Sequence, residues 1–256
     1  MTLRRAIGNR LTRGFEFVNE RAGRATRWSL QPYPPLLTLD AEITRLLRVT
    51  GATTVVDVGA HEGGFARSLR RSGFNGPIVS FEPHPGSFTA LEGTAGSDPN
   101  WHVRRYALGN ETGDAQLNEF DRGGGQFNSL RALGPHAQVY EPGLHRSGAT
   151  TVPVRRLADV WPFELAEPAR TLLKTDTQGH DLEVLAGAGD LLREIPAIVM
   201  EVAVQPLYDG APVIHEVFAR LTELGYEPTG TFPIRRYGGG ARVIEFDCTF
   251  VRPACG

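Results

Sequence analysis

The sequence predicts a doubly wound α/β fold, in which helices cover both faces of a mostly parallel, seven-stranded sheet. Short apolar runs alternate along the chain with helical segments, and some runs are apolar at consecutive positions, as at Val55 with Val56 and at Ile198 with Val199. Strands buried on both faces have this pattern, because helices cover each side of the sheet. Ligands of such folds bind at the carboxyl ends of the strands, so the functional residues should follow the strands directly.

The expected core elements begin near residue 40. A helix with Asp40 as its N-cap should bury Ile43, Leu46 and Leu47 and should end at Gly51. Further helices are expected between most of the strands, for example over 65–71 and 214–224. Six strands of the expected sheet can be placed on apolar runs, at 53–58, 78–82, 102–106, 171–176, 197–201 and 245–251.

The length of 256 residues suits one large domain, expected over 51–256, preceded by a helical extension over 1–50. Leu11, Phe15 and Val18 recur at helical spacing there, which favours an amphipathic helix that packs on the domain, covers its site or joins a second subunit in a homo-oligomer. Seven arginines in 1–27 could instead suggest a nucleic-acid or membrane arm. Arginine is abundant throughout, with 26 copies against a single lysine, so we interpret these residues as a solvated face.

Composition excludes several classes. The net charge is −2, no apolar stretch reaches the ~20 residues of a membrane span, and the first thirty residues lack the apolar core of a signal peptide. The chain has two cysteines, Cys248 and Cys255, without metal-site spacing. We therefore expect a soluble, cytoplasmic protein without membrane insertion, disulfide framework or zinc site.

The residues after the first two strands indicate a nucleoside site. The first strand runs into a glycine turn, Asp57-Val58-Gly59-Ala60-His61-Glu62-Gly63, and the second strand ends in Phe81-Glu82-Pro83. Glu82 follows the turn by about the 20 residues at which a carboxylate meets an adenosine ribose. A dinucleotide site would need glycine in place of His61, because the backbone approaches the pyrophosphate there. S-adenosylmethionine is therefore favoured over a nicotinamide or flavin dinucleotide.

Several motifs occur together in one order along residues 53–251, and with them the chain resembles the FkbM-type methyltransferases, a family with the Rossmann-like fold of class I methyltransferases. The segments that carry the resemblance are 57–63, 81–83, 107–109, 128–130, 173–179, Glu201 and 207–208. The chain departs from the family pattern at His61, commonly Asn, at Gln178, often Glu, and at Asp181, commonly Glu.

The resemblance implies methyl transfer from S-adenosylmethionine, usually to a hydroxyl of a sugar, polyketide, glycolipid or other secondary metabolite. It places Asp57 and Gly59 near the methionine portion of the cofactor, Glu82 on the ribose, and Ala107 with Leu108 against the adenine. Asn128 and Ser129 would lie on a mobile loop that helps to close the site. The complete set expected to bind the cofactor is Asp57, Gly59, Ala60, His61, Gly63, Glu82, Pro83, Ala107, Leu108, Asn128 and Ser129.

The stretch from Asp121 to Gly148 is rich in glycine and has little periodicity. We expect a substrate or lid loop at about 120–150, and an ordinary disordered surface loop is the alternative. Its polar composition suits a hydroxylated small molecule, and the catalytic half lacks the arginine groove with interleaved aromatics that nucleic acids require.

Three polar residues are candidates for catalysis. Asp176 ends the fourth core strand beside the cofactor turn and is the first candidate for the general base, His180 is the second, and Glu201 ends the neighbouring strand. Asp176 and Glu201 could also share one Mg²⁺, but two carboxylates make a sparse cage and we favour a site without metal. A nicotinamide-dependent oxidoreductase and a non-catalytic nucleoside-binding module remain as alternatives to an O-methyltransferase.

Overall fold

The computed structural model describes residues 38–162, 166–238 and 240–253. The chain divides into two units, Met1–Ala41 and Glu42–Gly256, and the sheet belongs to the second. Its seven strands run in the order β3-β2-β1-β7-β8-β10-β9, and β10 alone is antiparallel to both of its neighbours. This confirms the predicted mostly parallel, doubly wound sheet. The strands are β1 (Thr54–Val58), β2 (Ile78–Phe81), β3 (Trp101–Arg104), β7 (Thr171–Thr175), β8 (Ala197–Ala203), β9 (Glu227–Tyr237) and β10 (Arg242–Val251).

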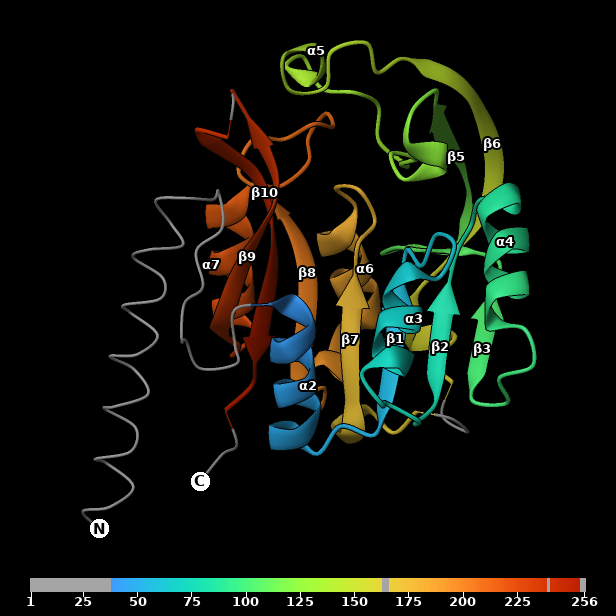
Figure 1. The fold of residues 1–256 in the computed structure, drawn as a ribbon, viewed down its shortest axis with the longest axis vertical. Coiled ribbons are helices and arrows are strands. Elements are labelled where there is room, and N and C mark those ends of the chain that lie inside the picture. Colours follow the sequence, from blue (N-terminus) through green and yellow to red (C-terminus); the bar gives the residue numbers. More distant parts are fainter. Residues whose placement is uncertain (1–37, 163–165, 239, 254–256) are drawn as a thin grey trace, which may run out of the picture. The chain divides into compact units, whose positions relative to one another are not determined.

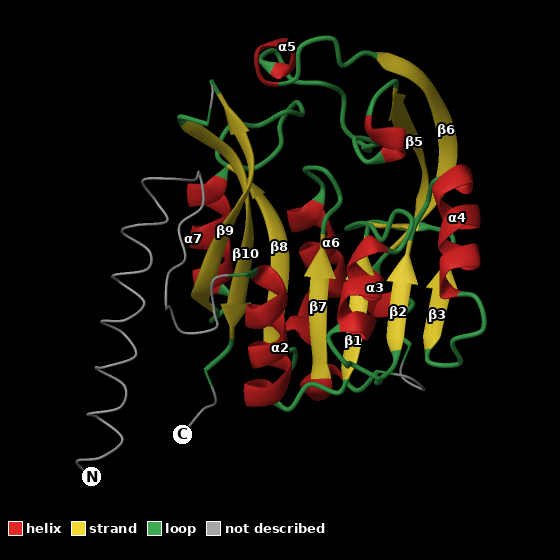
Figure 2. Cartoon of the chain, in the orientation of Figure 1, coloured by secondary structure: helices red, strands yellow, loops and turns green. Residues whose placement is uncertain are grey.

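Helices cover both faces of this sheet. Figure 2 shows α3 on the near face and α6 and α7 on the far face. All five residues of β1 and all five of β7 are buried, so each strand has apolar residues at consecutive positions, Val55 with Val56 and Leu172 with Leu173. The helices are α2 (Leu39–Thr50), α3 (Gly64–Arg71), α4 (Pro85–Ala95), α5 (Ala137–Tyr140), α6 (Asp181–Ala188) and α7 (Ile214–Glu223). The short 3₁₀ turns are η1 (Gly123–Gly125), η2 (Leu157–Asp159), η3 (Pro168–Arg170) and η4 (Gly189–Arg193).

A smaller sheet lies beyond the carboxyl ends of the parallel strands. It contains β4 (Ala107–Leu108), β6 (Arg146–Arg155) and β5 (Gly113–Phe120), in that order. Figure 1 shows β5, β6 and α5 above the ends of the arrows, so this part of the chain faces the edge where ligands bind.

The stretch 121–148 has more structure than its sequence predicts. It contains η1 and α5, and β6 begins at Arg146, so β6 includes the last three residues of the expected loop. Leu144 is fully buried and packs in one cluster with Phe120, Leu207 and Tyr208. The segment is therefore anchored by its own apolar core.

Other sequence expectations need correction. The first helix begins at Leu39, and the Thr38 hydroxyl oxygen, not Asp40, accepts the N–H of Ala41 at 3.2 Å. The third strand is Trp101–Arg104 where 102–106 was expected, and β4, β5, β6 and β9 were not predicted at all. The amphipathic helix expected around Leu11, Phe15 and Val18 lies outside the described residues. Among the described helices, none has the length and apolar character that crossing a membrane requires.

Candidate functional site

The glycine turn after β1 packs directly on the end of β7. Gly59 has φ +75°, and a Cβ built there would lie 1.9 Å from the carbonyl oxygen of Asp176. Gly63 has φ +83°, and a Cβ there would lie 2.8 Å from the Trp101 ring. Because only glycine fits both positions, the turn approaches Asp176 more closely than any turn with side chains could.

Glu82 lies beside this turn at the end of β2. Its Oε2 accepts the backbone N–H of His61 and its Oε1 accepts the backbone N–H of His84, each at 2.8 Å. The residue is only 7% exposed, and burial raises the pKa of its carboxyl above the usual value. Each oxygen retains a lone pair after one hydrogen bond, so the carboxylate can accept the protons of two vicinal ribose hydroxyls. This arrangement fits an adenosine ribose.

Replacement of Glu82 by alanine is expected to weaken binding of S-adenosylhomocysteine by about 1–3 kcal/mol, or roughly 5- to 150-fold in Kd, because a charged hydrogen-bond partner is lost. Isothermal titration calorimetry measures the change. Glu92→Ala, on the exposed side of α4, is the matched control and should leave Kd as it is. Equal affinity of the two variants would contradict the ribose assignment.

Lys174 joins the cofactor turn to the end of β7. Its Nζ lies 3.0 Å from Asp57 Oδ1 and 3.5 Å from Asp176 Oδ2, and it donates to the Gly59 carbonyl oxygen at 3.1 Å. Burial opposes the charge of Lys174, but the carboxylates of Asp57 and Asp176 outweigh burial and raise its pKa. Asp57 is fully buried and also accepts a hydrogen bond from the Ser80 hydroxyl. Asp57 therefore contacts Lys174, and Lys174 in turn contacts Asp176.

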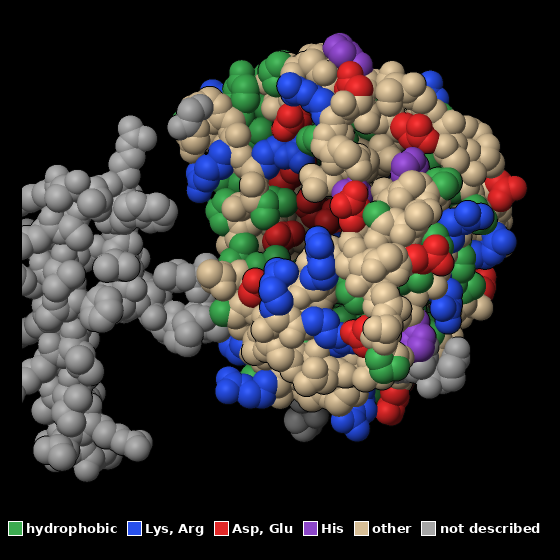
Figure 3. Space-filling model, turned by 45° about the vertical axis from the view of Figure 1, so that its right-hand side comes forward, with side chains coloured by type: hydrophobic (Ala, Val, Ile, Leu, Met, Phe, Trp, Pro, Cys, Tyr) green, Lys and Arg blue, Asp and Glu red, His purple; other side chains and the backbone are tan. Residues whose placement is uncertain are grey.

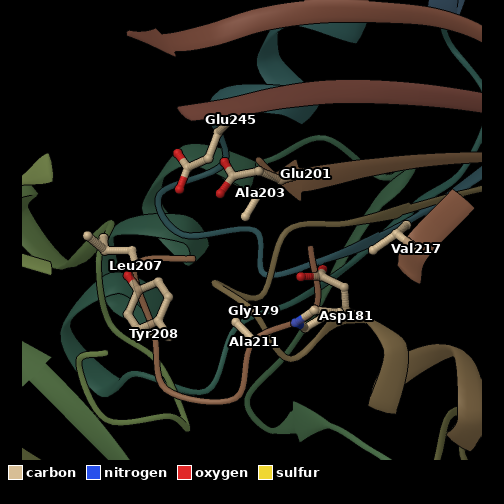
Figure 4. A pocket seen from close by; sticks show the side chains of 10 residues that line it. Gly179, Asp181, Glu201, Ala203, Leu207, Tyr208, Ala211, Val217 and Glu245 are labelled. Atoms are coloured by element: carbon tan, nitrogen blue, oxygen red, sulfur yellow. The ribbon is translucent and has the colours of Figure 1, made fainter. Parts of the chain in front are cut away.

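A pocket opens where β7 and β8 end. Figure 4 shows the carboxylates of Glu201 and Glu245 side by side on one wall, with Leu207 and Tyr208 on another. Figure 3 shows a hollow in this face of the molecule with acidic side chains at its floor and cationic ones around it. The pocket thus combines acidic and apolar walls. Its lining comprises Gly179, Asp181, Glu201, Ala203, Leu207, Tyr208, Ala211, Pro212, Val217 and Glu245.

Several carboxyls around this pocket hold protons unusually tightly. Burial, with neighbouring carboxylates, raises the pKa of Glu201 well above its usual value. The same causes raise the pKa of Asp181 to about 6 and that of Asp247 to about 7. Burial likewise raises the pKa of Glu245 to about 7, although Arg235 lowers it in part. Near neutral pH the group therefore contains both carboxylic acids and carboxylates, which can donate as well as accept hydrogen bonds.

The raised pKa of Asp247 predicts a pH-dependent effect on stability. The folded state binds this proton more tightly than the unfolded state does, so its contribution is complete below pH ~4 and is lost as the pH rises towards about 7. Asp247→Asn removes the ionisation. The variant should gain free energy of unfolding relative to the original protein at pH 8, and the gain should disappear near pH 4. Urea denaturation at the two pH values measures it, and a gain independent of pH would contradict the assignment.

Gln178 connects the two strand ends. Its Nε2 donates to Asp176 Oδ1 and to Glu201 Oε1, both at 3.1 Å. The Tyr208 hydroxyl donates to Gln178 Oε1 at 2.8 Å, and the Ser129 hydroxyl donates to the Gln178 carbonyl oxygen at 2.8 Å. The two strand-end carboxylates that the sequence predicts as catalytic are thus brought together through an amide.

The remaining predicted residues lie around these two centres. The His61 ring nitrogen Nε2 lies 2.9 Å from the Gly124 carbonyl oxygen, so the loop at η1 touches the cofactor turn. Asn128 Oδ1 accepts the N–H of Phe120, and Ser129 is buried. The placement of the other four is as follows: Ala60, Ala107 and Leu108 are buried, and Pro83 is partly buried beside Glu82.

His180 does not line the pocket. Its Nε2 lies next to Gly109, where a built Cβ would be 3.0 Å from it. Burial lowers the pKa of its imidazole, in spite of Glu183 nearby, which favours the neutral ring. His180 therefore lies beside Gly109, next to the predicted adenine segment.

Four residues of the site had no predicted role: Lys174, Gln178, Tyr208 and Glu245. One signal was available. Lys174 is the chain's single lysine and interrupts a buried strand, and a buried cation requires carboxylate partners. Tyr208 belongs to segment 207–208 of the family resemblance, but nothing in the sequence predicts its contact with Gln178, thirty residues away.

The donor set does not fit a shared Mg²⁺. The hydrogens of the Gln178 amide point at the two carboxylates that would have to bind the ion. Within the described ranges, no group of three or more His, Cys, Asp or Glu side chains could hold a metal.

The strand order, the glycine turn and the acidic residue at the end of β2 define a class I, S-adenosylmethionine-dependent methyltransferase. The chain belongs to the methyltransferase FkbM domain family, whose model matches residues 57–228. Because this is a family of methyltransferases, the chain is an enzyme. The oxidoreductase and the non-catalytic binding module are no longer alternatives.

Individual relatives are distant. A curated relative, the 2-O-methyltransferase NoeI of Sinorhizobium fredii (strain NBRC 101917 / NGR234), is 24% identical over 188 residues, which cover 70% of this chain and 74% of the relative. Among solved structures, magnesium protoporphyrin IX methyltransferase (ChlM) from Synechocystis PCC 6803 matches with a TM-score of 0.45 and 11% identity, over 84% of this chain and 78% of that one. Precorrin-6y C5,15-methyltransferase from Geobacter metallireducens GS-15 matches with a TM-score of 0.41 and 12% identity, over 86% and 93%.

Proposed function

We propose that the protein is an O-methyltransferase that acts on a hydroxyl of a small metabolite, a sugar or a sugar-bearing compound. The proposal is supported by the pocket at the ends of β7 and β8, which has both acidic and apolar walls, and by the turn at Gly59, which packs on the end of β7 at Asp176. Hydroxyls can hydrogen-bond to Glu201 and Glu245, while Leu207 and Val217 can pack against the C–H face of a sugar ring. The name of the relative NoeI, a 2-O-methyltransferase, supports the same chemistry.

S-adenosylmethionine, when bound, supplies a methyl group on a sulfonium that is already activated for in-line displacement. The chain has to hold the ribose, align the acceptor and take its proton. In the proposed site Glu82 holds the ribose, and the turn at Gly59 sets the cofactor beside Asp176.

Asp176 is the proposed general base. Its side chain is 35% exposed, Lys174 holds its Oδ2, and Gln178 donates to its Oδ1. The carboxylate is therefore oriented and still accessible from the site. As the acceptor oxygen bonds to the methyl carbon and the carbon–sulfur bond breaks, the hydroxyl proton moves to Asp176. Glu201, with its raised pKa, can keep a proton and donate a hydrogen bond to a second hydroxyl of the acceptor.

The acceptor class can be tested directly. The purified protein would be incubated with methyl-labelled S-adenosylmethionine and matched acceptors: free sugars, glycosides, their deoxy analogues, simple carboxylic acids, a protein and an RNA. Label should enter the sugars and glycosides and should be lost when the reacting hydroxyl is absent. Transfer to carboxylates, protein or RNA, with none to hydroxyls, would contradict the proposal.

A further inference from the structure

Gln178 adopts a backbone conformation that glutamine rarely takes. Its φ is +54°, in the left-handed region, where a side chain strains the backbone. The residue is 8% exposed and held at both ends, its carbonyl oxygen by Ser129 and its side-chain oxygen by Tyr208. Such strain persists only where the surroundings fix the residue, and it concentrates at functional sites.

The amide of Gln178 lies with its NH₂ group towards Asp176 and Glu201 and with its oxygen towards Tyr208. An amide oxygen only accepts and an amide NH₂ only donates. The Tyr208 hydroxyl lies 2.8 Å from Gln178 Oε1 and 2.8 Å from the Phe127 carbonyl oxygen, and its single proton is donated to one of the two at a time. In this arrangement both N–H groups of Gln178 are donated to the strand-end carboxyls.

Asp176 and Glu201 share one hydrogen-bond partner. This partner is the uncharged amide of Gln178 and not a cation. The surroundings are strongly acidic, and each N–H donates to a carboxyl oxygen, which favours the ionised form of the carboxyl that accepts it. The charged or titratable groups that face Asp176 and Glu201 are Lys174, Asp181, Tyr208, Glu245 and Asp247.

We propose that Gln178 is a positioning residue, whose NH₂ group holds Asp176 and Glu201 as a pair in the place of a bridging divalent cation. The effect of Gln178 on the reaction rests on the proposed function, whereas its hydrogen bonds to the two carboxyls do not. Two variants test the reaction and the hydrogen bonds separately. Gln178→Glu replaces the donors by a third carboxylate without changing the shape of the side chain, and Gln178→Met keeps the length and removes every hydrogen bond of the side chain.

The activity-independent test is binding of Mn²⁺, followed by electron paramagnetic resonance. Gln178→Glu should bind one ion with Kd of ~10⁻⁴–10⁻³ M, the range of weak carboxylate sites. The unmodified protein should not bind in this range, and neither should Gln116→Glu, the same change at an exposed position of β5. A folded Gln178→Glu that binds no Mn²⁺ would overturn the inference, as would equally strong binding by the unmodified protein.

A second test uses Gln178→Met and does not require Gln178→Glu to fold. With any acceptor that is methylated, kcat should fall by about 10- to 100-fold, as for loss of hydrogen bonds to a charged group, while the Kd of S-adenosylhomocysteine stays the same. Adding Tyr208→Phe to this variant should lower kcat little further, because both changes act through one amide. An unchanged kcat, or losses that multiply, would overturn the positioning role. If no acceptor is methylated, the proposed function fails. The Mn²⁺ result then still tests whether Gln178 holds Asp176 and Glu201 as a pair.

Discussion

Asp176→Asn is expected to lower kcat by ~10²-fold or more, because a carboxamide keeps the shape of the side chain and cannot take the acceptor proton. Cofactor affinity should be nearly unchanged, since the proposed nucleoside contacts are made by Glu82 and the glycine turn, and this turn packs on the backbone of Asp176, which the substitution keeps. The expected result is thus a loss of turnover that is separate from binding.

Steady-state kinetics and calorimetry with S-adenosylhomocysteine on one preparation measure the two effects. Asp190→Asn is the matched control, because its side chain is 91% exposed on η4. If Asp176→Asn turns over as fast as this control, Asp176 is not the base and Glu201 becomes the first alternative.

Lys174→Met is expected to lower the free energy of unfolding by about 3–5 kcal/mol, the range for removing one partner of a buried ion pair. Methionine fills most of the space of the lysine stem but leaves the fully buried Asp57 without its cation. The Gly59 carbonyl oxygen loses its donor at the same time, so binding of S-adenosylhomocysteine should weaken as well.

Urea denaturation with an unchanged m-value gives the stability difference. Arg193→Met removes a cation whose side chain is 83% exposed and should cost little. Combining Lys174→Met with Asp57→Asn removes both charges and should recover part of the lost stability. A loss below about 1 kcal/mol for Lys174→Met alone would show that the pair does not stabilise the turn.

The sequence predicted the parts of the fold whose residues are buried on both faces. β1, β2, β7 and β8 follow directly from apolar runs, and their predicted bounds lie within two residues of the observed ones. β9 escaped prediction because it is an edge strand, whose pattern is broken by Pro228, Gly230, Pro233 and charged residues. Proline is tolerated at a sheet edge, where one side of the strand needs no partner.

The site was predictable as far as topology determines it. Carboxyl ends of neighbouring parallel strands meet at one edge, which brings Asp176 and Glu201 close together whatever the loops do. The residues that orient these two carboxylates come from other parts of the sequence. Tyr208 and Ser129 reach Gln178 only because the segments that carry them pack against the strand ends through Phe120 and Leu144.

The most direct measurement is a crystal structure with S-adenosylhomocysteine and a methyl acceptor bound together. We expect both ribose hydroxyls to bond to Glu82, and the acceptor oxygen to lie within ~2.6–3.2 Å of an Asp176 carboxylate oxygen, in line with the sulfur. A ribose away from Glu82, or an acceptor oxygen closer to another side chain than to Asp176, would contradict this expectation.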